Sequence, residues 1–211
     1  MTHLVVFIAG AGQDSRAWDE QVARLHGRPV LAVAPSDLAT PFSFEAALGG
    51  LDERIRAAGA SSVTLIGLSI GGMIATRYAA ANPDRVTGLL LSGSQIRPNA
   101  ALMRVQRAVL RAIPGRALPL PAGLDKTTFL SLLDAAAGVD LRADVPRIHA
   151  PALVLCGSKD RANLPAARAL AATLPDAALR IVPGGGHDLA ADAPDDVADA
   201  VRTLLERTAP A

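Results

Sequence analysis

One short segment restricts the possible folds more than any other part of the chain. The apolar run Val63-Thr64-Leu65-Ile66 is typical of a buried strand, and Gly67-Leu68-Ser69-Ile70-Gly71 follows it directly. An apolar segment that can form a helix comes next, from Met73 to Ala80. A strand, a G-x-S-x-G turn and a helix in this order predict a nucleophile elbow, a sharp turn that exposes its serine at the end of a sheet strand.

The residues of this turn suit that geometry. Gly67 and Gly71 have no Cβ, so the strand and the helix can pass close to each other on either side of Ser69. The helix behind the turn directs free backbone N–H groups and a partial positive charge at the same point, which suits a developing oxyanion. A glycine-rich turn can also hold a serine by chance, but the strand before it and the helix after it favour the functional interpretation.

Apolar runs alternate with helical segments along most of the chain. Phe44, Leu48, Leu51 and Ile55, for example, form one apolar stripe behind the helix-capping Ser43. Strand-like runs lie at residues 4–9, 29–35, 63–66, 86–92, 152–156 and 178–182. This alternation predicts an α/β fold, with a mostly parallel sheet covered by helices on both faces.

The alternation stops between Ile96 and Arg147, where helical segments follow each other without a strand. Because about 50 residues are too few for an independent core, we expect an insertion at about 96–147 over one end of the sheet, within a single domain, 1–211. The first helix of this insertion combines an apolar stripe with arginines 104, 107 and 111, interpreted as a solvated face rather than a site for an acidic substrate. The stripe consists of Leu102, Val105, Val109 and Ile113.

Composition limits the partners and the compartment. The net charge of +1 argues against a nucleic-acid partner. The single cysteine, Cys156, cannot form an internal disulfide, which favours a reducing compartment, and its strand-like context predicts a core position. The apolar run at the N-terminus is too short for a signal peptide, and no run approaches the ~20 residues of a membrane span. We therefore expect a cytoplasmic protein.

A nucleophilic serine needs a base and a carboxylate, and the chain offers both after later strands. Of the four histidines, only His187 lies in a glycine-rich loop that follows a strand. Asp160 lies in the loop after the preceding strand, so the order is serine, aspartate, histidine. Asp188 and Asp192 stay open as alternative acids, although a sequence neighbour such as Asp188 is poorly placed to reach its own histidine's ring.

Two backbone N–H groups are candidates for an oxyanion hole. One belongs to Ile70, directly after the serine, and the other to Ala11 in the loop after the first strand, with Gly12 as the alternative. Gly10-Ala11-Gly12 also resembles part of a dinucleotide-binding fingerprint, but Ser15 stands where a third glycine belongs. No cofactor and no metal are expected.

Together these residues resemble the α/β-hydrolase superfamily, over nearly the whole chain from Leu4 to about Leu205. Residues 67–73 are similar to the elbow of its small esterase, lactonase and cofactor-free haloperoxidase-like branch. The segments 82–86, 157–160 and 186–187 are similar to further parts of that pattern. The resemblance implies a compact α/β-hydrolase fold in which the insertion at about 96–147 is a cap that roofs an acyl pocket. The expected substrate-binding residues are Trp18, Leu102, Met103, Val109 and Phe129.

Three departures from the family pattern stand out. The first strand ends in Ala9-Gly10, where relatives usually have His-Gly and the histidine supports the oxyanion loop. The chain starts directly at this strand, so the resemblance implies about six strands without the usual N-terminal hairpin. The loop at residues 35–41 lacks the frequent glycine- and histidine-bearing turn, which suggests a more open site on that side.

The sequence thus predicts a serine hydrolase that cleaves a small, largely apolar ester, thioester or lactone through an acyl-enzyme on Ser69. Its expected partner is a small-molecule acyl substrate. Two alternatives remain, since a fold does not dictate a reaction. The same triad could serve a perhydrolase, acyltransferase or lyase, or the chain could be a non-catalytic binding module.

Overall fold

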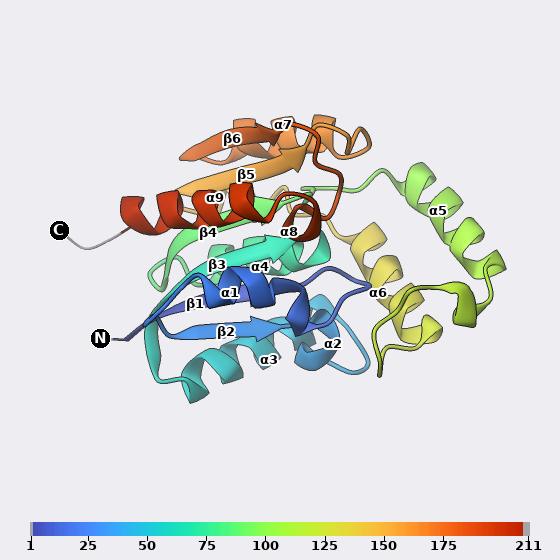
Figure 1. Cartoon of the computed structure of the whole chain (residues 1–211), viewed down its shortest axis with the longest axis horizontal. Coiled ribbons are helices and arrows are strands. Elements are labelled where there is room, and N and C mark those ends of the chain that lie inside the picture. The colour runs from blue at the N-terminus through green and yellow to red at the C-terminus, as the bar shows by residue number, and fades with distance from the viewer. Residues whose placement is uncertain (1, 209–211) are drawn as a thin grey trace.

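The computed structural model describes residues 2–208, and its centre is one parallel sheet of six strands (Figure 1). The strand order is β2-β1-β3-β4-β5-β6, and every neighbouring pair is parallel. This confirms the predicted fold class and strand number. The strands are β1 (Thr2–Ile8), β2 (Val30–Val33), β3 (Ala60–Leu68), β4 (Val86–Ser92), β5 (Ala152–Gly157) and β6 (Ala177–Val182).

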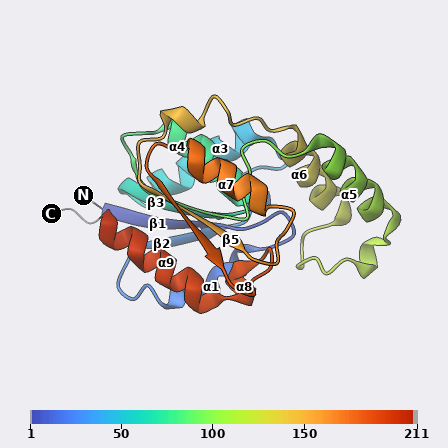
Figure 2. The same ribbon diagram turned by 90° about the horizontal axis from the view of Figure 1, so that it is seen from above.

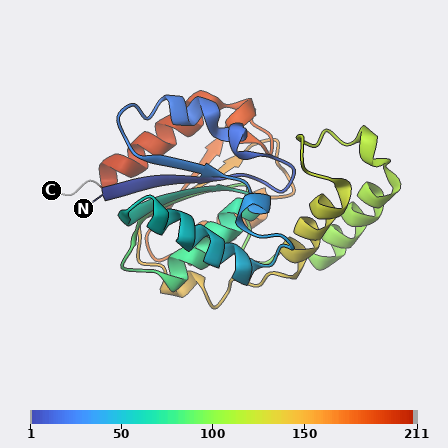
Figure 3. The same ribbon diagram turned by 90° about the horizontal axis from the view of Figure 1, so that it is seen from below.

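Helices cover both faces of the sheet, as Figures 2 and 3 show. One face carries α3 (Phe44–Ala57), α4 (Ile70–Ala81) and α7 (Leu164–Thr173), and the other carries α1 (Asp19–Ala23) and α9 (Pro194–Arg207). The sheet has a hydrophobic core on each face, and alternate residues of β1 belong to different cores. Val6 and Ile8 pack in one core, and Val5 and Phe7 pack in the other. Burial of each such side chain stabilises the fold by roughly 1.5–3 kcal/mol. Because both faces of the strands are buried, their sequences are continuous apolar runs.

Side-chain caps set where several helices begin. Ser43 Oγ accepts a hydrogen bond from the Ala46 N–H at the start of α3, at 3.1 Å. Asp125 accepts from the Thr128 N–H at 2.7 Å, at the start of α6 (Lys126–Gly138). Such caps stabilise a helix by roughly 1 kcal/mol each.

The segment after β2, expected as a loop, contains a short helix instead, α2 (Pro35–Leu38). Pro35 occupies its first position, where the missing N–H costs nothing, and Asp37 Oδ2 accepts from the Ala34 N–H at 2.8 Å. One turn is too short to show a helical period in the sequence, so this helix had no detectable pattern.

The segment between β4 and β5 forms α5 (Ala100–Ala112), the 3-10 helix η2 (Gly115–Ala117), α6 and the 3-10 helix η3 (Val145–Arg147). The helices α5 and α6 lie beyond the carboxyl ends of the strands (Figure 1), whereas η3 packs against α4. The remaining short elements are η1 (Ser15–Trp18) and α8 (Leu189–Asp192). Among residues 2–208, no helix is long and apolar enough to cross a membrane.

Candidate active site

Ser69 sits between β3 and α4 in a strained turn. Its φ of 55° makes it the only non-glycine residue with positive φ among the described residues. A Cβ on Gly67 would lie 2.5 Å from the Gly71 carbonyl carbon, and one on Gly71 would lie 2.3 Å from the Ile8 oxygen. Glycine is therefore required at both flanks, and the packed strand and helix hold the serine in a conformation that costs about 1–3 kcal/mol.

His187 and Asp160 meet at the ends of two neighbouring strands. The loop after β5 carries Asp160 and the loop after β6 carries His187, with Asp160 Oδ2 2.7 Å from His187 Nδ1. The Asp160 side chain is 7% exposed and the histidine ring 46% exposed. Nδ1–H donates to the carboxylate in this arrangement, which leaves Nε2 as the free acceptor on the ring.

Asn163 and Gln95 extend this pair, and the sequence analysis missed both. Asn163 Nδ2 donates to Asp160 Oδ1 at 2.8 Å and to Oδ2 at 2.9 Å, while Asn163 Oδ1 accepts from Gln95 Nε2 at 2.5 Å. Asn163 Nδ2 also lies 3.2 Å from His187 Nδ1, but both groups are donors when Nδ1 holds the proton. The amides orient the carboxylate toward the ring. An asparagine three residues after an aspartate is ordinary in turns and gave no signal.

The two alternative acids have other partners. Asp192 Oδ2 accepts from the Gly186 N–H at 2.7 Å and so holds the histidine loop. Asp188 Oδ2 accepts from Gln13 Nε2 at 2.6 Å. The geometry therefore favours Asp160 as the partner of His187.

Close backbone contacts also shape the histidine loop. A Cβ on Gly157 would lie 2.2 Å from the Gly186 oxygen, so β5 and this loop touch directly. Gly93 follows β4 with a φ of +54°, and a Cβ there would lie 2.9 Å from His187 Cε1. Gly93 thus supports one side of the imidazole ring, a role without any sequence signature.

A cavity of about 480 Å³ brings Ser69, His187, Ala11 and Ile70 together. Its wall is mostly apolar but includes the side-chain amides of three residues. The other lining residues are Met73, Gly93, Gln95, Pro98, Leu102, Met103, Gln106, Leu133, Ala136, Ala162 and Asn163. Of the predicted substrate-binding residues, Leu102 and Met103 belong to this lining.

The other three predicted lining residues lie elsewhere. Trp18 is 1% exposed and packs on Phe7, with ring centroids 5.2 Å apart. Phe129 lies against the loop after β1, where its Cε2 would be 3.2 Å from a Cβ on Gly12. Val109 is 57% exposed, because α5 turns its valine stripe away from α6. These positions correct the expectation that all three border the cavity.

One of the three cap arginines also differs from its prediction. Arg107 is only partly exposed and pairs with Asp134 of α6, at 2.8 Å. Arg104 and Arg111 are exposed, as expected of a solvated face. Arg107 lies with the partly buried Met103 and Leu110, so this side of α5, rather than the valine stripe, faces α6.

Ser69 and His187 share the cavity, but no hydrogen bond joins them within residues 2–208. Catalytic hydrogen bonds are commonly loose in an empty site and tighten when substrate binds.

Other reactive side chains are occupied or buried. Burial, together with the charge of Asp160, raises the pKa of the Cys156 thiol to about 11. The thiol is therefore protonated at neutral pH and unsuited to nucleophilic attack. His3 lies between Ser62 and Thr64, each 3.1 Å from a ring nitrogen, and burial lowers its pKa. In the described part of the chain, no three His, Cys, Asp or Glu side chains cluster so as to hold a metal ion.

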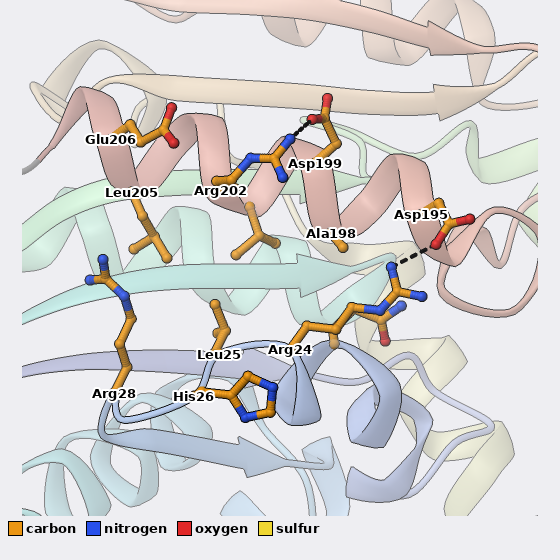
Figure 4. Close-up of a pocket in the computed structure, with 12 residues that line it drawn as sticks. Arg24, Leu25, His26, Arg28, Asp195, Ala198, Asp199, Arg202, Leu205 and Glu206 are labelled. Carbon is orange, nitrogen blue, oxygen red and sulfur yellow. Dashed lines mark hydrogen bonds and ion pairs between the residues drawn. The ribbon is translucent and has the colours of Figure 1, made fainter.

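A larger groove, of about 650 Å³, lies between the end of α1 and α9 (Figure 4). It contains none of the predicted site residues. Two of its arginines pair within the groove: Arg24 pairs with Asp195 at 2.7 Å, and Arg202 pairs with Asp199. This groove lacks a nucleophile with an adjacent base, so the smaller cavity at Ser69 is the candidate active site.

Comparison with known proteins agrees with this fold. The pimeloyl-[acyl-carrier protein] methyl ester esterase of Neisseria meningitidis is 28% identical over 200 residues, which cover 76% of this chain and 77% of that protein. The enol-lactonase of Burkholderia xenovorans superposes with a TM-score of 0.84 at 23% identity, covering 98% of this chain and 92% of that one. A thermophilic esterase of Thermogutta terrifontis superposes with a TM-score of 0.81, also at 23% identity, covering 99% and 91%.

The fold of the parallel sheet and its covering helices is thus shared with both solved structures. At these identities the two superpositions show a common fold and nothing more. The sequence profile of the Alpha/beta hydrolase family, however, matches residues 5–200, which is nearly all of the chain. The chain therefore belongs to the alpha/beta hydrolase family.

Proposed function

We propose that the chain is a serine hydrolase that cleaves a small, largely apolar ester, thioester or lactone. The observation that carries this proposal is the 2.7 Å contact between Asp160 Oδ2 and His187 Nδ1, in the same cavity as the strained Ser69. Esterases among the relatives support the same reaction class. A cavity of about 480 Å³ lies within the ~300–1,000 Å³ usual for small-molecule sites, and its apolar wall supports an apolar acyl group.

In the proposed reaction, Ser69 Oγ attacks the carbonyl carbon while His187 Nε2 takes the hydroxyl proton. The Ile70 and Ala11 N–H groups bind the resulting oxyanion. The bond to the leaving oxygen or sulfur then breaks, and the proton on His187 passes to that atom. Water attacks the acyl-enzyme, His187 takes its proton, and the proton returns to Ser69 as the free acid leaves. Asp160 stays ionised and stabilises the imidazolium.

Labelling with a fluorophosphonate probe tests the nucleophile. The wild type should be labelled on Ser69, and Ser69→Ala should abolish both labelling and hydrolysis of short-chain nitrophenyl esters. Ser131→Ala is the matched control, because Ser131 is an exposed serine of α6 outside the cavity. Equal labelling of the wild type and Ser69→Ala contradicts the proposal.

The chemical outcome needs a separate measurement. Product analysis with purified protein should give the free acid as the main product in water alone. A dominant peracid in the presence of peroxide, or a dominant new ester in the presence of an alcohol, would instead favour perhydrolysis or acyl transfer with the same triad. Activity across a series of acyl-chain lengths then defines the size of the acyl group.

A further inference from the structure

The side chain of Gln13 connects two loops of the candidate active site. Gln13 Oε1 accepts a hydrogen bond from the Gly10 N–H at 2.8 Å, inside the loop that contains Ala11. Gln13 Nε2 donates to Asp188 Oδ2 at 2.6 Å, and Asp188 directly follows His187. One amide therefore links the loop of the candidate oxyanion donor to the loop of the candidate base.

The link at Gly10 bears on which N–H group can face the cavity. The Gly10 N–H is used by Gln13, whereas the Ala11 N–H has no hydrogen-bond acceptor within residues 2–208. Consecutive peptide groups share a Cα atom, so fixing the Gly10 amide restricts the orientation of the Ala11 amide. A Cβ on Gly10 would lie 3.0 Å from Gln13 Oε1, so this glycine gives the amide room to approach.

The link at Asp188 is equally sensitive to loss. Asp188 Oδ1 is buried without a hydrogen-bond partner among the described residues. The hydrogen bond from Gln13 to Oδ2 is therefore important for stabilising this carboxylate. Removing a partner from a buried charged group costs more than an ordinary hydrogen bond is worth. Loss of the amide would therefore disturb the histidine loop as well as the loop after β1.

We propose that Gln13 is a positioning residue for the reaction proposed above, on which this inference rests. It is not among the residues that line the cavity. It holds the Ala11 N–H in its oxyanion-binding orientation and keeps the loop after β1 in a fixed position relative to His187. In this chain it takes over the loop support that the resemblance assigns to a histidine at the position of Ala9.

Substitution of Gln13 separates positioning from simple stability. Gln13→Ala should lower kcat roughly ten- to a hundredfold, somewhat less than deleting an oxyanion donor, and should change KM little. The inhibition constant of a boronic acid, which mimics the tetrahedral intermediate, should rise in parallel with the loss in kcat. Unchanged kcat in a folded Gln13→Ala protein overturns the inference, as does a loss confined to KM.

A reversed pair provides the rescue. In Gln13→Glu the introduced carboxylate can still accept from Gly10 but repels Asp188, so kcat should fall again. Adding Asp188→Asn restores both contacts with reversed polarity, and kcat should recover to within about threefold of the wild type, since coupled residues are non-additive. A double variant with wild-type melting temperature and no recovery overturns the inference.

Two controls keep the result interpretable. The near-isosteric Gln13→Glu carries the test if Gln13→Ala does not fold. The Gln13→Ala/Asp188→Ala variant removes the buried carboxylate without restoring the contact to Gly10, so it should stay impaired; full recovery would mean that Gln13 serves only to solvate Asp188, which contradicts the inference. If wild type and Ser69→Ala are equally inactive, the proposed function has failed, independently of Gln13.

Discussion

Gly93 shows at the level of a single residue how a backbone position supports the chemistry. Its φ of +54° is unfavourable for other residues, and a Cβ would come within 2.9 Å of the His187 ring. We expect Gly93→Ala to lower kcat at least tenfold, because the ring must move, with a loss of roughly 1–3 kcal/mol of folding free energy. Gly49→Ala is the control, since nothing lies within 4 Å of that position in α3. Kinetics and thermal melts measure both, and full activity in Gly93→Ala would contradict this role.

Cys156 provides a second prediction for a single residue. Because burial raises the pKa of its thiol to about 11, alkylation at pH 8 should be very slow in the folded protein and fast in urea. The stabilising contribution of the neutral thiol is complete below its ordinary pKa, about 8.5, and is lost as the pH rises toward 11. Mass spectrometry of the alkylated protein measures the rates. Rapid modification without unfolding would show that the thiol is accessible.

At the level of elements, Asp52 joins α3 to its neighbours. Its Oδ1 accepts from the Tyr78 hydroxyl of α4 at 2.9 Å and from Arg85, just before β4, at 2.7 Å. Burial alone would raise the pKa of Asp52, but these hydrogen bonds outweigh burial and lower it. Asp52→Asn should lower the free energy of unfolding by roughly 1–2 kcal/mol at neutral pH. Because the folded-state pKa is lowered, this contribution is present above about pH 4 and is lost below it, so the variant and wild type should converge in acid melts.

The orientation of α5 gives a prediction for the cap. Met103 lines the cavity, whereas Val109, two turns away, is exposed to solvent. Met103→Ala should raise KM for apolar esters several-fold, since each buried CH₂ contributes about 0.8 kcal/mol. Val109→Ala, the matched control on the same helix, should leave KM and the melting temperature unchanged. A rise in KM in Val109→Ala would mean that α5 rotates when substrate binds.

Across the whole molecule, the charge is unevenly distributed. Residues 96–147 carry eight lysines and arginines against four acidic residues, while the rest of the chain carries thirteen against sixteen. Six of these eight basic residues, against two of the four acidic ones, lie in residues 96–138, whose helices α5 and α6 lie beyond the carboxyl ends of the strands, on the side of the candidate cavity. This field should speed the approach of anionic esters. The kcat/KM for an anionic ester should decrease as the salt concentration rises from about 0.01 to 0.15 M, whereas kcat/KM for a neutral isostere should change little. Equal salt dependence for both would exclude steering.

The sequence by itself determined the order of the elements, the elbow at Ser69 and the loops that carry Asp160 and His187. Each of these has a local signature: an apolar run of strand length, a helical period, or a glycine next to a strand end. The tertiary structure decided the rest. Gln13 and Asp188 are 175 residues apart and meet only through folding, and the outward turn of Val109 depends on how α5 packs on α6. Contacts between distant segments leave no local pattern, because they depend on which surfaces the whole fold brings together.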